Sequence, residues 1–296
     1  MEEKLQKFQA LKKKAEQKVI IGGVVVVLGL IAYVGLIDYG PFGLLLIIPG
    51  IIYAIIGFAQ FKTIRKDFKT EVLREVVESF VDDGIFDPSR GLSQGIVYST
   101  EFLKRADVFE SEDFLSGKMD GVSFISSDVK LQERHVEHTQ NGTRTTYVTY
   151  FLGRVFRFEF NKNFEGYLQV LEKGRPVKNR GYKKIKLESV DFNKKFKTYC
   201  TSEHTAFYVL TPHFMEALRE FEKNNKGKIS FSFIDNYLYI GINNFRDTFE
   251  LKMFQVLNDE TFNEFKQELY VIQEVVKELR LNNNIFKKEW IKWIQV

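Results

Sequence analysis

Two long apolar runs near the N-terminus most constrain what this chain can fold into. The first, Val19–Ile37, and the second, Phe42–Phe61, contain no charged residue. At about 1.5 Å of rise per residue, each run is long enough as a helix to cross a hydrocarbon core about 30 Å thick. The short turn Asp38–Pro41 separates them, so the two helices must run antiparallel. The sequence therefore predicts a two-helix transmembrane hairpin over residues 19–61.

Basic residues flank this hairpin on both sides, and the turn between the spans has none. They are Lys4, Lys7, Lys12, Lys13, Lys14, Lys18, Lys62, Arg65, Lys66 and Lys69. Lys and Arg near the ends of membrane spans stay on the cytoplasmic side. We therefore expect both termini in the cytoplasm and the hairpin in the inner or plasma membrane. A cleaved signal peptide is the alternative for the first run, but its apolar stretch exceeds the usual ~7–15 residues.

Small residues recur along one face of the second span. They are Gly43, Gly50, Ala54 and Gly57. Such a face allows close backbone approach, either to Gly22 and Gly29 of the first span or to a second copy of the chain. The sequence therefore leaves open hairpin packing and a homo-oligomer. With no acidic or basic side chain inside either span, we do not expect this chain alone to form a transporter or channel.

The rest of the chain predicts an α+β domain with a mainly antiparallel sheet and packed helices. Phe156, Phe158 and Phe160 alternate with polar residues, as in a half-buried strand. Thr211-Pro212 predicts a helix start, and Asp235-Asn236 predicts a hairpin turn. From Asp259 to Leu281 an apolar stripe recurs at helical spacing. This stripe predicts a helix packed on the sheet, with a coiled-coil partner as the alternative.

These patterns divide the chain into five segments. We expect a basic cytoplasmic N-terminal segment (1–18), the transmembrane hairpin (19–37 and 42–61), a membrane-proximal helical region (62–110), the cytoplasmic α+β domain (111–284) and a basic amphipathic tail (285–296). The net charge of +4 is too small to predict nucleic-acid binding. Cys200 is the only cysteine of the chain, so no internal disulfide forms.

Several segments of the soluble part carry a family resemblance. They are Ser111–Gly117, Phe151–Phe160, Leu187–Phe196, Leu210–Met215 and Phe249-Glu250. Together they resemble the DUF3137 family, bacterial membrane proteins of undefined function, over roughly residues 80–281. The resemblance implies the N-terminal hairpin and no particular reaction. Some members are labelled galanin-like, which does not fit a chain with two membrane spans.

We recognise no complete set of catalytic or cofactor-binding residues in the chain. His135 and His138 form the one close histidine pair, but on a strand a three-residue offset points their side chains to opposite faces. The chain lacks GxxxxGK[ST] and GxGxxG patterns, and Cys200 has no recognised histidine partner. We therefore assign no catalytic residue, cofactor or metal from the sequence.

Two basic segments are candidate contacts for anionic lipid or for a partner. The first is the loop with Lys173, Arg175, Lys178, Arg180, Lys183 and Lys184. The second is the tail, with Lys287, Lys288, Trp290, Lys292 and Trp293. Cationic and tryptophan side chains favour an anionic membrane surface. The alternatives are a solvated connection for the loop and docking on the domain for the tail.

These observations lead to two hypotheses of function. The first is a membrane-anchored cytoplasmic interaction module that binds a protein or lipid partner at the inner face of the membrane. The second is a membrane-tethered enzyme whose site is assembled only in the fold. A pocket with two or more buried titratable side chains would favour the enzyme, and an exposed groove or sheet edge would favour the module.

Overall fold

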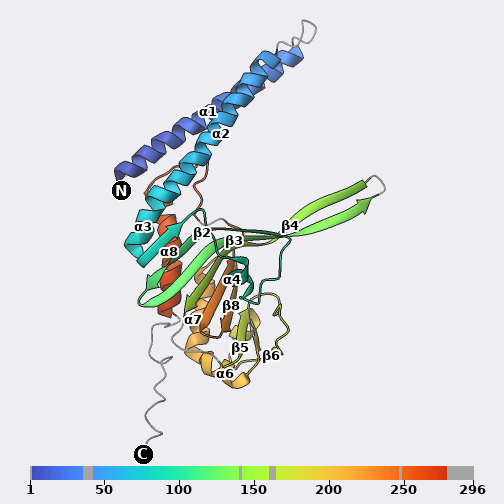
Figure 1. The fold of residues 1–296 in the computed structure, drawn as a ribbon, viewed down its shortest axis with the longest axis vertical. Coiled ribbons are helices and arrows are strands. Elements are labelled where there is room, and N and C mark those ends of the chain that lie inside the picture. The colour runs from blue at the N-terminus through green and yellow to red at the C-terminus, as the bar shows by residue number, and fades with distance from the viewer. Residues whose placement is uncertain (1, 36–42, 140–141, 160–164, 247–248, 279–296) are drawn as a thin grey trace, which may run out of the picture. The chain divides into compact units, whose positions relative to one another are not determined.

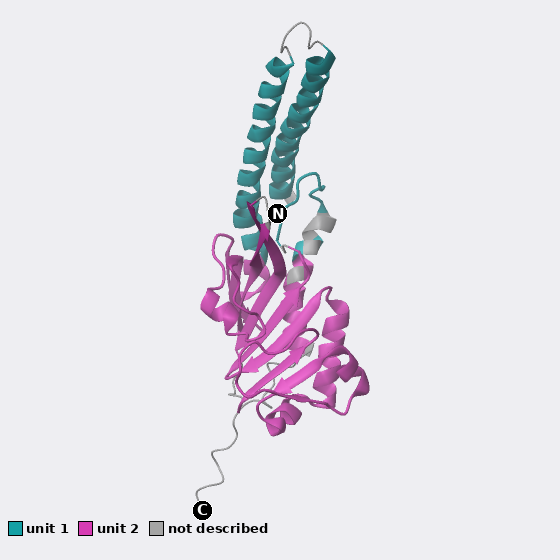
Figure 2. Ribbon diagram, turned by 90° about the vertical axis from the view of Figure 1, so that its right-hand side faces the viewer, with its two compact units in different colours: residues 1–76, 249–265 teal, residues 77–248, 266–296 magenta. Residues whose placement is uncertain are grey.

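The computed structural model describes residues 2–35, 43–139, 142–159, 165–246 and 249–278. The chain divides into two compact units, which Figure 2 colours separately. Unit 1 comprises residues 1–76 and 249–265, and unit 2 comprises residues 77–248 and 266–296.

Unit 1 is built on two long helices. Helix α1 spans Glu2–Gly35 and α2 spans Leu44–Phe68 (Figure 1). A π-helical turn, η2 (Lys69–Leu73), and helix α3 (Arg74–Phe80) continue directly from α2. Both α1 and the helix that begins at Leu44 are long and apolar enough to cross a membrane. The two predicted apolar helices are therefore present, whereas the predicted turn lies outside the described residues.

Glycines bring α1 and α2 together. A Cβ atom added to Gly22 would lie 2.6 Å from the carbonyl oxygen of Gly50, and it would also meet Ala54. At Gly57, an added Cβ would lie 2.9 Å from the carbonyl oxygen of Ala15. At Gly43, it would lie 2.4 Å from that of Gly29. The small-residue face of α2 is therefore occupied by α1 of the same chain, the first of the two interpretations that the sequence left open.

Ion pairs tie the segment after residue 248 to α2 and η2 within unit 1. The carboxylate of Glu250 accepts from Arg65 Nη1 at 2.7 Å and from Lys69 Nζ at 3.1 Å. Phe68 packs between Phe8 of α1 and Phe265, with ring centroids 5.6 and 5.7 Å apart. Two of the bases that flank the second span therefore also hold unit 1 together.

Unit 2 contains one nine-stranded antiparallel sheet among its described residues. Its order is β1-β2-β3-β4-β9-β8-β5-β7-β6. The strands are β1 (Asp82–Asp87), β2 (Val108–Met119), β3 (Val122–Thr139), β4 (Gly142–Glu159), β5 (Tyr167–Leu171), β6 (Lys183–Ile185), β7 (Lys197–Cys200), β8 (Lys228–Ile234) and β9 (Tyr237–Asn243). Every adjacent pair is antiparallel. The α+β class is confirmed.

Helices cover one face of this sheet. They are α5 (Val190–Lys195), α6 (Glu203–Val209), α7 (Pro212–Asn224) and α8 (Asp259–Glu278). Phe214 and Phe221 of α7 make edge-on ring contacts with Phe233 and Phe231 of β8, both at 5.9 Å between centroids. Such buried aromatic pairs add to the apolar area removed from water. The alternating Phe residues of the strands therefore lie on the face that the helices cover, as the predicted half-buried strands require.

The opposite face carries a second cluster over β3 and β4. Helix α4 (Gln94–Tyr98) begins with Ser93, whose hydroxyl caps the backbone NH of Ile96. Leu92, Val97 and Leu103 pack in one cluster with strand residues. These strand residues are Val129, Leu131, Phe151 and Val155. The sheet is thus buried on both faces in this region.

Most predicted elements are confirmed. Thr211 caps α7 with Pro212 at its first turn, and Asp235, at a φ of 53°, lies in the turn between β8 and β9. In α8, Phe265, Leu269 and Ile272 are buried, whereas the side chains of Phe262 and Leu279 lie outside the described residues.

The helical expectation for residues 62–110 needs a correction in its second half. Strand β1 and the first residues of β2 lie there. The acidic, glycine-containing sequence of β1 has low strand propensity. It becomes a strand by pairing with β2, where Phe86 lies opposite Leu115.

Candidate functional site

A long exposed β-ribbon extends from the middle of the sheet. It consists of residues 134–139 of β3 and 142–148 of β4, and Figure 1 shows it reaching well beyond the neighbouring strands. Its apolar side chains face solvent: Val136 is 40% exposed, Tyr147 53% and Val148 50%. In the same two strands, Leu131 and Phe151 are buried where they cross the body of the sheet. The ribbon has no core of its own.

Two polar side chains mark the place where the ribbon leaves the sheet. On the β4 side, Asn243 at the end of β9 donates to the carbonyl of Tyr150 at 2.9 Å and accepts from the NH of Leu152 at 3.2 Å. On the β3 side, the carboxylate of Asp107 accepts from the NH of Arg134 at 2.7 Å. Both side chains replace a strand partner, so the ladder ends here on each side and the ribbon continues as two strands.

The edges of this sheet differ in how they are protected against further pairing. Strand β1 carries Asp82, Asp83 and Asp87 and a bulge, and β6 is three residues long and contains Lys183 and Lys184. Charges, bulges and short length all discourage pairing at an edge. The β4 edge of the ribbon, Thr143–Val148, contains no acid, lysine or proline. Within the described chain, no strand other than β3 pairs with this part of β4.

The ribbon also contains the histidine pair. His135 lies opposite Thr146 and His138 opposite Thr143, so the two imidazoles are on opposite faces of the ribbon. The Nδ1 atom of His138 lies 3.1 Å from the hydroxyl of Thr143. Among the described residues, no group of three His, Cys, Asp or Glu side chains has the geometry to hold a metal ion.

Glu101 organises the basic loop. Its carboxylate is 1% exposed and accepts from Lys178 Nζ at 3.1 Å, Arg180 Nε at 2.6 Å and the hydroxyl of Tyr182 at 3.1 Å. Its own carbonyl accepts from the NH of Val177 at 2.9 Å. Burial, with the charge and hydrogen bond of Glu101 adding to it, raises the pKa of Tyr182. Sequence reasoning missed Glu101, because nothing near it in the chain indicates a distant partner.

The predicted contact residues fall into three groups. Lys178 and Arg180 are tied to Glu101. Lys173, Arg175, Lys183 and Lys184 are exposed, the last two on strand β6. The tail residues Lys287, Lys288, Trp290, Lys292 and Trp293 lie outside the described residues.

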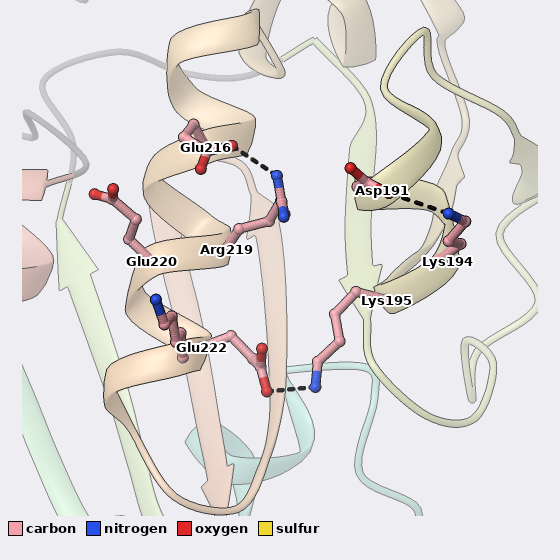
Figure 3. Close-up of a pocket in the computed structure, with 8 residues that line it drawn as sticks. Asp191, Lys194, Lys195, Glu216, Arg219, Glu220 and Glu222 are labelled. Atoms are coloured by element: carbon pink, nitrogen blue, oxygen red, sulfur yellow. Dashed lines mark hydrogen bonds and ion pairs between the residues drawn. The ribbon is translucent and has the colours of Figure 1, made fainter.

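A charged pocket of about 480 Å³ lies between α5 and α7 (Figure 3). An ion pair joins Lys195 Nζ to Glu222 Oε1 across the pocket, at 2.5 Å. A second joins Arg219 Nη1 to Glu216 Oε2 along α7, at 2.9 Å. Lys194 bonds Asp191 at 3.2 Å along α5. Both charge signs are present, and three ion pairs join lining residues, so the pocket presents no single-sign surface to a ligand.

A second pocket, of about 360 Å³, is lined by residues of β4, β9, the end of α7 and α8. Arg154, 4% exposed, is one of them. Its guanidinium donates to Asp128 Oδ1 at 3.1 Å, Ser126 Oγ at 3.2 Å and the carbonyl of Asp113 at 3.0 Å. Among the described lining residues, Arg154 is the single buried titratable side chain. The pocket therefore lacks the pair of buried titratable groups that would favour the enzyme hypothesis.

Comparison with known proteins finds a family model that matches part of the chain. No curated protein matches. Among solved structures, the crystal structure of the mycobacterial trehalose monomycolate transport factor A, TtfA, is similar at 8% identity over 67% of this chain and 88% of that chain, with a TM-score of 0.38. Residues 149–281 match the model of DUF3137, described as a protein of unknown function. The family resemblance indicated by the sequence motifs is thereby confirmed for residues 149–281, from the start of the sheet-bound part of β4 through α8.

Proposed function

We propose that this chain is a membrane-anchored interaction module whose ribbon binds a protein partner. In this proposal the hairpin α1–α2 anchors the chain in the inner or plasma membrane. Both termini and the α+β domain are on the cytoplasmic side, as the flanking bases predict. The domain supplies a rigid sheet, and the ribbon is the part of it that reaches a partner.

The exposed ribbon is the observation that carries this proposal. A two-stranded ribbon is marginally stable in water without a third strand or a packed face. This one exposes Tyr147, Val148 and Val136, and among the described strands only β3 pairs with residues 143–148 of β4. Backbone pairing along a sheet edge is a recurring mode of protein recognition. A bound protein would cover the apolar side chains and satisfy this edge.

Lipid contact is the weaker form of the proposal. The exposed bases Lys173, Arg175, Lys183 and Lys184 suit anionic headgroups, and the tail with Trp290 and Trp293 suits a membrane surface. However, two of the six loop bases are held by Glu101. A homo-oligomer through Gly43, Gly50, Ala54 and Gly57 has less support, because these residues pack against α1 of their own chain.

The test is to shorten the ribbon without disturbing the sheet. Arg134 and Tyr147 lie opposite each other, so residues 135–146 can be replaced by Asn-Gly, which favours a two-residue hairpin turn. The caps from Asp107 and Asn243 are retained. The full-length protein and the shortened variant are each co-expressed with a differently tagged copy of the same chain and purified from membranes after cross-linking in intact cells. Bound proteins, including the tagged second copy, are identified by mass spectrometry.

We expect the shortened variant to lose a protein that the native chain captures. The control is a chain with Lys173→Ala and Arg175→Ala, which should keep that protein. If the shortened variant captures the same proteins in the same amounts, the ribbon is not the binding element. If the loop variant alone loses binding, the basic loop is the contact instead.

A further inference from the structure

We propose that the partner of the ribbon is a second copy of this chain, paired antiparallel along the β4 edge, Thr143–Val148. This inference rests on the proposed function and names the occupant of the ribbon. In the resulting dimer, β3 and β4 of one copy continue into β4 and β3 of the other as a four-stranded sheet.

The composition of the two ribbon edges favours β4. Thr, Tyr and Val have high strand propensity, and Thr143–Val148 consists of these residues except for Arg144. The β3 edge, over residues 133–138, contains two Glu, two His and one Arg. Glu133 and Glu137 are on the same face, since both are odd-numbered positions of one strand. Pairing of β3 with itself would gather four carboxylates, and pairing of β4 with itself gathers none.

Symmetry restricts the register. Two identical antiparallel strands related by a twofold axis place one residue opposite its own copy. If this residue were Arg144, two guanidinium groups would face each other, and like charges directly opposite are unfavourable. Centred on Thr146, the pairing places Thr145 opposite Tyr147 and Arg144 opposite Val148. Each exposed apolar side chain of β4 then has a neighbour in the other copy, and no like charges meet.

The pairing also removes the cause of the ribbon's low stability, which is that it has only two strands. Three or more strands are needed for a sheet to be stable independently, and the dimer has four at this place. Confinement of both copies to one membrane raises their effective concentration, as any tether does. A strand edge that is too weak to dimerise a soluble protein can therefore pair when both copies are anchored in the same membrane.

Single cysteines provide the test, in the full-length chain in its own membrane. The native thiol does not interfere, because Cys200 is 1% exposed and burial raises its pKa. Thr146→Cys places a thiol on the β4 edge. His135→Cys is the matched control, because His135 lies directly opposite Thr146 in the ribbon, on the β3 edge. Mild oxidation tests the register centred on Thr146. A short bis-maleimide reaching about 8 Å covers the neighbouring registers, since diagonal cross-strand neighbours lie at that distance.

We expect covalent dimers from Thr146→Cys and monomers from His135→Cys. Equal dimer formation by both variants would indicate random collision and overturn the proposal, and so would its absence from both. Adding Tyr147→Lys to Thr146→Cys should lower the dimer fraction several-fold, whereas Arg134→Lys, at the position opposite Tyr147, should leave it unchanged. If Thr146→Cys stays monomeric while ribbon shortening still removes a captured protein, the proposed function stands and the second copy is excluded as its partner.

Discussion

The buried carboxylate of Glu101 lies 2.6 Å from Nε of Arg180, a residue of a loop 79 positions later in the chain. The side chain of Glu101 is 1% exposed and that of Arg180 is 38% exposed. The φ of Glu101 is 59°, a value that L residues rarely adopt. A strained backbone at a buried charge is maintained because three donors of the loop converge on it. The basic loop is thus fixed to Glu101, in the segment that follows α4.

Removal of this carboxylate should release the loop. In Glu101→Ala, Lys178 and Arg180 would become hydrated and Tyr182 would lose its acceptor, at a cost of about 1–3 kcal/mol in the free energy of unfolding. Trypsin should then cleave after Lys178 and Arg180 faster than in the native chain. Glu188→Ala removes an exposed acid of the same region and is the control. Unchanged cleavage rates in Glu101→Ala would mean that the loop is held by other contacts.

Helix α8 should behave as core. Leu269 is 1% exposed, so Leu269→Ala should lower the free energy of unfolding by about 2–5 kcal/mol. Lys277→Ala, at an exposed position of the same helix, should change it by less than about 0.5 kcal/mol. Thermal unfolding of the full-length protein in detergent measures both. A Leu269→Ala protein with the native melting temperature would favour an external helical partner for the stripe.

Glu172 predicts a loss of stability in acid. Burial acts to raise its pKa, but hydrogen bonds from the NH of Ile229, from Lys228 and from Lys195 outweigh burial and hold the pKa below the ordinary value of 4.5. A carboxyl with a depressed pKa stabilises the fold above its unfolded pKa, and this contribution is lost as the pH falls through the folded value. Stability should therefore decrease below pH 4.5.

The matched variant for this prediction is Glu172→Gln. It should be less stable than the native protein at neutral pH and should show a smaller further decrease in acid, because its side chain does not titrate. Urea unfolding at a series of pH values makes the comparison. Parallel curves for the two proteins would assign the acid sensitivity to other carboxyl groups.

Local patterns predicted much of the fold. The uncharged runs predicted the apolar parts of α1 and α2, Thr211-Pro212 predicted the start of α7, and Asp235-Asn236 predicted the turn between β8 and β9. In each case the signal is contained within a few neighbouring residues. The stripe in α8 likewise follows from helical periodicity, and its described members Phe265, Leu269 and Ile272 are buried.

The candidate site was harder to predict from the sequence. It depends on where a strand lacks a neighbouring strand and on side chains whose hydrogen-bond partners are distant in the chain. Nothing in Thr143–Val148 shows that β9 stops at Asn243 and leaves this part of β4 unpaired. A weak signal existed: polar residues occupy both faces of the strand from Glu133 to His138, which is typical of a ribbon solvated on both sides. Glu101 gave no signal in the sequence, because the donors to its carboxylate are 77 or more residues away.

A cytoplasmic module must be on the same side of the membrane as both termini, so the membrane topology of the chain is the most direct test. Single cysteines at Leu5, Asn179 and Tyr39, each in a Cys200→Ser chain, are labelled in intact cells with a membrane-impermeant maleimide. We predict labelling of Tyr39→Cys alone, with Leu5→Cys and Asn179→Cys becoming reactive after the cells are opened. Labelling of Asn179→Cys in intact cells would place the domain outside and contradict the account.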